Sequence, residues 1–173
     1  MKKLLTAGIL VIGLALYTGT NANAQSFSEG DLVLNAGIGL GSVYGWTGTG
    51  SLGLPIGAGV EYGVADLETG SIGVGGDFGF VSSSFVTVYT IGARGSYYFN
   101  ELLEIENEKV DLYGGLGLYY RAWSWSGTTF SGFGGITAAF HAGGRYYFAD
   151  NIGGYAELGN NWGWLNVGLV FKL

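Results

Sequence analysis

Apolar residues alternate with small or polar residues along most of the chain after residue 30. Between residues 31 and 41, for example, Leu32, Leu34 and Ile38 fall on one face of an extended chain, and Asn35 and several glycines fall on the other. This period of two residues is typical of a β-strand whose two faces meet different surroundings. The pattern recurs in eight segments: residues 31–41, 51–64, 71–81, 85–99, 110–121, 134–148, 151–159 and 164–173.

These segments predict an all-β fold of eight strands, each of about ten residues, which is the length that crosses a bilayer when tilted. Pro55 lies inside the second segment, and because proline cannot donate to a strand ladder we expect a β-bulge there. The acidic stretch at residues 100–109 breaks the alternation. The sequence alone allows either a helical turn or an extension of the two flanking strands at this place.

Composition indicates what the two strand faces meet. Charged residues make up only 12% of the chain, against roughly 25% in soluble domains, while 35 residues are glycine and 16% are aromatic. A soluble barrel would have to turn the glycine face to water, and that face offers no solubilising charge. In a membrane the apolar face meets lipid, and the small and polar residues fill a narrow interior. We therefore predict an eight-stranded antiparallel up-and-down transmembrane β-barrel.

The first 24 residues have the features of a cleaved secretory signal. Lys2 and Lys3 precede an apolar run over residues 4–17, and Ala22-Asn23-Ala24 matches the cleavage pattern. The alternative, a membrane anchor, needs an apolar run of about 20 residues. We expect cleavage after Ala24 and a single barrel domain over residues 25–173. Cleavage changes the net charge from −6 to −8, which excludes nucleic acid as a partner because nothing would neutralise its phosphates.

The acidic residues gather at one predicted end of the barrel. With both chain ends in the periplasm, the acids at that end are Glu29, Asp31, Asp66, Glu68, Glu101, Glu104, Glu106, Glu108, Asp111 and Asp150. The other acids, Glu61, Asp77 and Glu157, are predicted to point into the lumen. The outer loops carry aromatic residues, Ser, Thr and Gly, so they would not repel an anionic glycolipid leaflet. We expect outer-membrane lipid and lipopolysaccharide as surroundings.

The chain ends within an alternating strand, and this ending points to a family. In a closed barrel the last strand pairs with the first, since an unpaired backbone group in hydrocarbon costs several kcal/mol. Over residues 25–173 the sequence resembles the small eight-stranded outer-membrane β-barrel proteins of the OmpX and OmpA-barrel type. That resemblance implies a bacterial outer-membrane location, a monomer, and recognition by the outer-membrane assembly machinery. The residues that match the family's terminal signal are Leu165, Val167, Leu169, Phe171 and Leu173, although the family usually ends in an aromatic residue.

Polar residues predicted to face the lumen form a candidate network. Its members are Glu61, Asp77, Arg94, His141, Arg145 and Glu157. Glu157 is expected diagonally opposite Arg145 and His141, and either Glu61 or Asp77 is expected to pair with Arg94. Buried charges must be paired, so we interpret this network as structural, ahead of a gating role and of catalysis.

The number and position of the histidine and cysteine residues argue against catalysis and metal binding. Some eight-stranded barrels are lipid acyltransferases that use a His with Ser and Asp near the outer rim. Here His141 is the only histidine, it lies in mid-strand, and the outer loops carry no acid to orient it. With one histidine and no cysteine, zinc binding is not expected either. We predict no enzyme and no cofactor, and a narrow passive channel and a lipid-modifying enzyme stand as the alternatives.

Bulky aromatic residues are predicted to close the lumen. The first three strands line it mainly with glycine, and the later strands contribute Tyr98, Tyr113, Tyr119, Tyr147, Tyr155 and Trp164. These side chains would fill the volume left by the glycines and stop solutes. At the outer loops, Trp46, Trp123 and Trp125 form either an aromatic interface belt or a surface for contact with a sugar or a receptor. The function predicted from sequence is therefore a structural or cell-surface interaction role.

Overall fold

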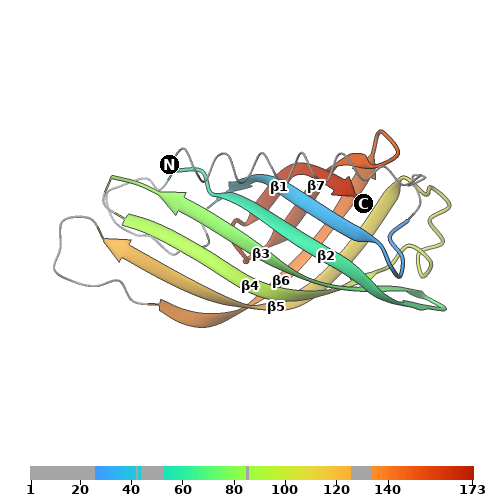
Figure 1. Cartoon of the computed structure of the whole chain (residues 1–173), viewed down its shortest axis with the longest axis horizontal. Helices are drawn as coiled ribbons and strands as arrows, with labels where there is room; N and C mark the ends of the chain where they lie inside the picture. The colour runs from blue at the N-terminus through green and yellow to red at the C-terminus, as the bar shows by residue number, and fades with distance from the viewer. Residues whose placement is uncertain (1–25, 42, 44–52, 85, 126–133) are drawn as a thin grey trace.

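The computed structural model describes residues 26–41, 43, 53–84, 86–125 and 134–173, which form a closed barrel of eight antiparallel strands (Figure 1). The predicted signal segment and Trp46 lie outside the described residues. None of the described residues belongs to a helix long and apolar enough to span a membrane. The strands are β1 (Leu32–Leu40), β2 (Ile56–Leu67), β3 (Gly70–Ser82), β4 (Val86–Tyr98), β5 (Val110–Trp125), β6 (Gly134–Tyr147), β7 (Ile152–Gly159) and β8 (Leu165–Lys172).

Each strand pairs with the next along the chain, and β8 closes the barrel against β1. The closing ladder runs from Val33↔Lys172 to Leu40↔Leu165. The backbone N–H of Leu173 then donates to the carbonyl of Leu32 at 2.8 Å. The pairing therefore uses the chain to its last residue, and the predicted up-and-down barrel is confirmed.

The strands of the barrel differ in length, so its wall is taller on one side than on the other. The first described residue, Ser26, the C-terminal Leu173 and the turns β2–β3, β4–β5 and β6–β7 lie at one end, here called the terminal end, and the opposite end is called the loop end. β4, β5 and β6 contain 13, 16 and 14 residues, whereas β7, β8 and β1 contain 8, 8 and 9. In Figure 1, β3 and β5 accordingly project at the loop end.

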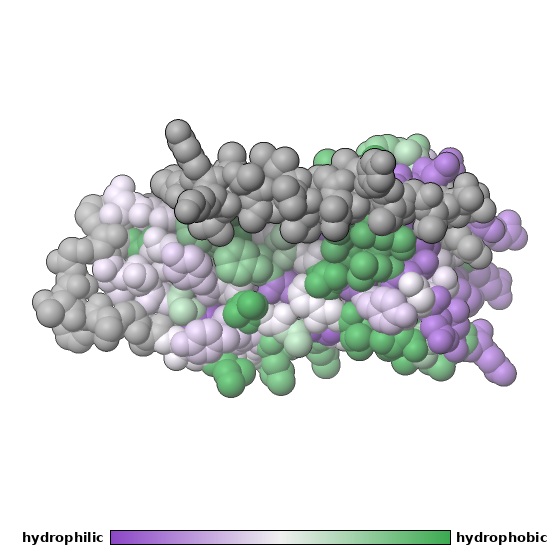
Figure 2. Space-filling view, viewed as in Figure 1, coloured by the Kyte–Doolittle hydropathy of each residue, from purple (hydrophilic) through white to green (hydrophobic). Residues whose placement is uncertain are grey.

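Apolar side chains cover the outside of the barrel, as the alternation predicts. Leu116 is 72% exposed, Ile136 is 79% exposed and Leu169 is 49% exposed, while neighbours on the same strands such as Tyr119 and Val170 are fully buried inside. Figure 2 shows apolar residues over the middle of the visible face and hydrophilic residues gathered at the terminal end. Exposed apolar surface on this scale is unusual for a soluble monomer.

The expectation of a bulge at Pro55 is wrong. β2 begins at Ile56, so Pro55 stands just before the ladder, where its missing N–H leaves nothing unpaired, and its carbonyl accepts from the N–H of Gly39 at 2.8 Å. The register of β2 against β3 shifts instead between Gly63 and Ala65, at the terminal end.

The acidic stretch at residues 100–109 forms a compact turn and does not extend the strands. The Leu103 N–H donates to the carbonyl of Phe99 at 2.9 Å, and Glu104 adopts a φ of 53°. The Asn100 side chain holds the turn closed, because its amide donates to the Val110 carbonyl and its Oδ1 accepts from the Leu112 N–H. One helix-like hydrogen bond is thus followed by a left-handed residue, which stops a helix from continuing.

Candidate functional site

The six polar residues predicted for the lumen all point into it and are buried. They come from β2, β3, β4, β6 and β7, and each is at most 5% exposed. Alternation explains this placement, since every one of them lies on the strand face opposite the exposed apolar residues. The structure gathers them into two layers, one around Arg94 and one around Arg145.

Arg94 holds the central layer together. Its guanidinium lies 3.3 Å from Asp77 Oδ2 and 2.7 Å from Glu157 Oε2. Asp77 also accepts from the Tyr119 hydroxyl at 2.7 Å, and Glu157 accepts from the Tyr113 hydroxyl at 3.1 Å. Two carboxylates thus share one guanidinium, and neutral donors complete their hydrogen bonding, as buried charges require.

Arg145 organises the second layer, nearer the terminal end. Its Nη2 lies 2.6 Å from Glu61 Oε2, which also accepts from the Tyr98 hydroxyl at 2.8 Å. Its Nη1 lies 3.9 Å from Asp111 Oδ2. The guanidinium carbon sits 4.7 Å from the centre of the Tyr113 ring, within cation–π range. Aromatic rings and carboxylates together surround this cation.

Two of the ion pairs cross the lumen, whereas Arg94–Asp77 and Arg145–Asp111 join neighbouring strands. Gly143 pairs with Glu157, so Arg145 and His141 do stand diagonal to Glu157 as expected. Nevertheless Glu157 binds Arg94 and Arg145 binds Glu61. In a narrow closed barrel the inward side chains converge on the axis, so long arginines reach partners on opposite strands as easily as diagonal neighbours.

Buried charges and amides beyond the predicted set also face the lumen. Asp111 lies at the terminal end as expected, where it is fully buried and accepts from the Phe27 N–H. Lys172 is 2.7 Å from Asp31, and Arg121 donates to the carbonyls of residues 160 and 161. Strand parity would have found Asp111 and Arg121, which share a face with Tyr113 and Tyr119.

Among the described residues, the His141 side chain makes one hydrogen bond, to Ser96. Ser96 Oγ and His141 Nε2 lie 2.9 Å apart, and both residues are buried. Within the described part of the chain, Nδ1 of His141 has no hydrogen-bond partner. A catalytic triad needs an acid at that nitrogen and a nucleophile that substrate can reach. This pair therefore lacks both requirements for acyl transfer.

The β7–β8 loop folds into the lumen at the loop end. Asn161 is fully buried, and its amide donates to Asp77 at 3.2 Å and to Glu157 at 2.9 Å. Trp162 is 3% exposed and packs against Gly57 and Gly79, where an added Cβ would collide with the indole. The glycine wall thus accommodates a tryptophan.

The expectation that Trp164 fills the lumen is wrong, because Trp164 is 51% exposed. The chain leaves the β-ladder before Leu165, so strand parity does not apply to the loop, and the Trp164 N–H donates to Gly41 outside the ladder. The five predicted tyrosines are buried: Tyr98, Tyr113, Tyr119, Tyr147 and Tyr155.

Trp123 and Trp125 are half-buried on the lumen-facing side of β5, near the loop end. They pack against a buried cluster formed by Val81, Val86 and Val88. Their alternation along β5 matches that of Tyr119 and Arg121, which point inward. This packing gives the two tryptophans a structural role, and their contact with a sugar or a receptor stays a prediction.

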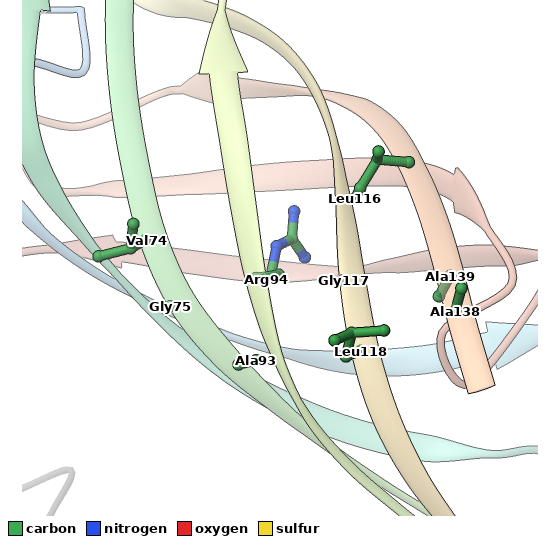
Figure 3. Close-up of a pocket in the computed structure, with 9 residues that line it drawn as sticks. All are labelled: Val74, Gly75, Ala93, Arg94, Leu116, Gly117, Leu118, Ala138 and Ala139. Atoms are coloured by element: carbon green, nitrogen blue, oxygen red, sulfur yellow. The ribbon is translucent and has the colours of Figure 1, made fainter. Parts of the chain in front are cut away.

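An apolar groove lies on the outer wall over β3 to β6 (Figure 3). Val74, Leu116 and Leu118 flank it, and Ala93 and Gly117 lie between them. Arg94 borders it only through its strand position, since its guanidinium binds Asp77 and Glu157 inside. Among the described residues, no group of three or more His, Cys, Asp or Glu side chains is placed to hold a metal ion.

Comparison with known proteins identifies the fold through solved structures. No protein-family model and no curated protein matches the chain. The N-terminal β-barrel domain of Pseudomonas aeruginosa OprF matches with a TM-score of 0.61 at 14% identity, over 85% of this chain and 100% of that one. A de novo designed transmembrane β-barrel matches with a TM-score of 0.57 at 15% identity, over 86% of this chain and 100% of that one.

A further match is the outer membrane protein OprG of Pseudomonas aeruginosa, with a TM-score of 0.54 at 10% identity, over 87% of this chain and 99% of that one. At these identities the likeness concerns the fold. The chain therefore has the fold of the small eight-stranded outer-membrane β-barrel proteins, the family that its sequence resembles.

Proposed function

We propose that the protein is an integral outer-membrane protein that holds a β-sheet above the cell surface for contact with other proteins. The apolar outer face supports membrane insertion, because a lipid-facing band about 25 Å tall is what a spanning barrel presents. The acidic terminal end lies in the periplasm, and the loop end faces outward. Insertion by the assembly machinery uses the terminal strand with Leu165, Val167, Leu169, Phe171 and Leu173.

The filled lumen supports a structural role for the barrel itself. The layers around Arg94 and Arg145 lie across the lumen, and the inward-folded Trp162 lies at its loop end. These layers disfavour a passive channel, and the buried Ser96–His141 pair offers no reason to favour a lipid-modifying enzyme. Liposome swelling tests the filled lumen: proteoliposomes should exclude arabinose as protein-free liposomes do, and ready entry of the sugar would contradict it.

The single observation that carries the interaction role is the unequal strand length. Each residue of a strand tilted by about 40° rises roughly 2.5 Å along the barrel axis. The 16 residues of β5 therefore rise about 40 Å, against about 20 Å for the 8 residues of β7. The protruding sheet is defined as residues 81–82, 86–89, 122–125 and 134–137, the loop-end parts of β3 to β6 beyond the last β6–β7 pair.

One edge of the protruding sheet is open. Pairing of β6 with β7 runs only from His141↔Gly159 to Tyr147↔Gly153, so among the described residues the upper part of β6 has no strand neighbour on that side. Phe140 turns its N–H and carbonyl toward this side, where both bond to Asn160. By alternation, the backbone groups of Gly134 and Ile136 point the same way.

An open edge of this composition favours strand addition. Residues 134–137 are Gly, Gly, Ile and Thr, with no charge or proline to block pairing. An extended segment of a second protein would add as a further strand, with main-chain hydrogen bonds giving affinity. We expect recognition to depend on the backbone of residues 134–137 more than on their side chains.

Two substitutions at Ile136 separate backbone from side-chain recognition. Ile136→Pro removes an N–H that points away from β5 and that no described strand pairs with, and Ile136→Ala removes the side chain but keeps that N–H. Proteoliposomes carrying each variant are panned with a random peptide phage library. Ile136→Pro should lose the phage that the parent protein captures, and Ile136→Ala should retain most of them. Equal capture by Ile136→Pro and the parent would refute the edge as the binding surface.

A further inference from the structure

The segment that precedes β1 enters the barrel. Phe27 is 1% exposed, and its ring stacks on Tyr98 with centroids 4.0 Å apart and an interplanar angle of 17°. The guanidinium carbon of Arg145 lies 5.7 Å from the centre of the same ring. The Phe27 ring therefore covers the charged layer around Arg145 from the terminal end.

Hydrogen bonds hold this segment across the mouth of the barrel. On one side the Phe27 N–H donates to Asp111 Oδ1 of β5 at 3.0 Å. On the other side the Gly30 N–H donates to the carbonyl of Gly63 on β2 at 3.0 Å, and the Gly63 N–H donates to the carbonyl of Asp31 at 2.9 Å. β2 and β5 are not neighbours in the barrel, so residues 27–31 span the opening from wall to wall.

The closing seam adds a third attachment. Lys172 of β8 donates to the carbonyl of Ser26 at 3.3 Å and lies 2.7 Å from Asp31 Oδ2. Gly63 also lies so close to the segment that an added Cβ would collide with the carbonyl of Ser28. The strand wall is shaped at this place to receive the segment.

We propose that residues 26–31 are a built-in stopper, in which Phe27 seals the terminal-end mouth of the lumen against water. The segment closes this mouth because it is attached to β5 on one side and to β2 on the other. The seal keeps solvent from the Glu61–Arg145 ion pair and from Asp111, all of which are nearly or fully buried. This inference does not depend on the protruding sheet or on any surface partner.

A cysteine reporter behind Phe27 measures the seal. The natural chain contains no cysteine, so Ser71→Cys places a single thiol at a lumenal position that is 2% exposed and paired with Tyr98. The folded protein in detergent micelles is treated with a cationic methanethiosulfonate, and the labelling rate is measured. Behind an intact stopper this thiol should react far more slowly than a thiol at the exposed Thr69.

Two independent changes remove the seal. Phe27→Ala deletes the ring, and Gly63→Ala keeps the ring but pushes the segment off the wall. Each should raise the labelling rate of the reporter by roughly 10- to 100-fold, the factor that corresponds to losing the burial of one Phe side chain. Phe148→Ala is the matched control, because Phe148 lies at the same end but is 59% exposed on the outside. It should leave the rate unchanged.

Heat-modifiable migration on gels confirms that each variant is folded before it is labelled. If Phe27→Ala folds poorly, Gly63→Ala alone decides the question, since it leaves the aromatic ring in the chain. The proposal is overturned if the Ser71→Cys thiol already reacts as fast as the Thr69→Cys thiol in the parent protein. It is equally overturned if neither variant accelerates labelling, or if Phe148→Ala accelerates it as much.

Discussion

Replacing Arg94 by Leu tests whether the charges inside the barrel are a structural network. Arg94 is the cation shared by Asp77 and Glu157, at 3.3 and 2.7 Å, and all three side chains are almost fully buried. Leucine fills part of the volume but leaves two carboxylates without a cation. Each carboxylate keeps neutral donors, from Tyr119 or Tyr113 and from Asn161.

The expected loss of unfolding free energy follows from the burial of the two carboxylates that Arg94→Leu leaves without a cation. Breaking a buried ion pair by removing one partner costs about 3–5 kcal/mol, because the other charge stays buried without compensation. The remaining neutral donors soften this loss but do not supply a positive charge, so we expect Arg94→Leu to lose about 3–5 kcal/mol in total. Such a loss is a large fraction of the stability of a typical domain, about 5–15 kcal/mol.

Urea unfolding in detergent micelles, followed by heat-modifiable migration, measures the free energy of unfolding. The matched control is the triple variant Arg94→Leu, Asp77→Asn, Glu157→Gln, which removes all three charges together. Its stability should return to within about 1–2 kcal/mol of the parent, because this variant leaves none of the three buried charges without its counter-charge. If Arg94→Leu alone leaves the unfolding free energy unchanged, the network has no structural role.

Two further predictions concern side-chain packing. Gly57→Leu should lower the free energy of unfolding by about 1–3 kcal/mol through overpacking, because a Cβ at this position would lie 2.5 Å from the Trp162 ring. Urea unfolding should show no such loss for the control Gly135→Leu, since nothing lies within 4 Å of a Cβ there. Replacing Trp123 and Trp125 together with Ala should lower the unfolding free energy by a few kcal/mol. Unchanged stability would contradict a packing role for these two tryptophans.

The strands and their outward faces could be predicted because both follow from a local period of two. Leu116 and Leu118 are outside and Tyr119 is inside for the same reason, and closure follows from the need to pair every edge in hydrocarbon. The start of β2 and the position of its irregularity were harder to predict. Proline suggested a bulge at Pro55, but a strand can equally well start after a proline, and the bulge occurs near Gly63 instead.

The contents of the lumen could be predicted only in part. Strand parity places Arg94, Arg145 and Glu157 inside, but it does not choose among partners across the axis, because many side chains converge there. The residues that close the two mouths, Phe27 and Trp162, belong to irregular segments. Their positions depend on long-range hydrogen bonds, such as that from the Phe27 N–H to Asp111, that no local pattern encodes.

A transmembrane barrel requires lipid to contact the leucine side of the strands while the opposite side faces the barrel axis. Single cysteines along residues 114–120 of β5, each carrying a nitroxide in lipid vesicles, test this by collision with oxygen and with a water-soluble nickel complex. Oxygen accessibility should alternate, with maxima at Leu116, Leu118 and Tyr120 and low collision with nickel at these sites. Absence of alternation, or strong nickel collision at these three positions, would contradict the transmembrane barrel.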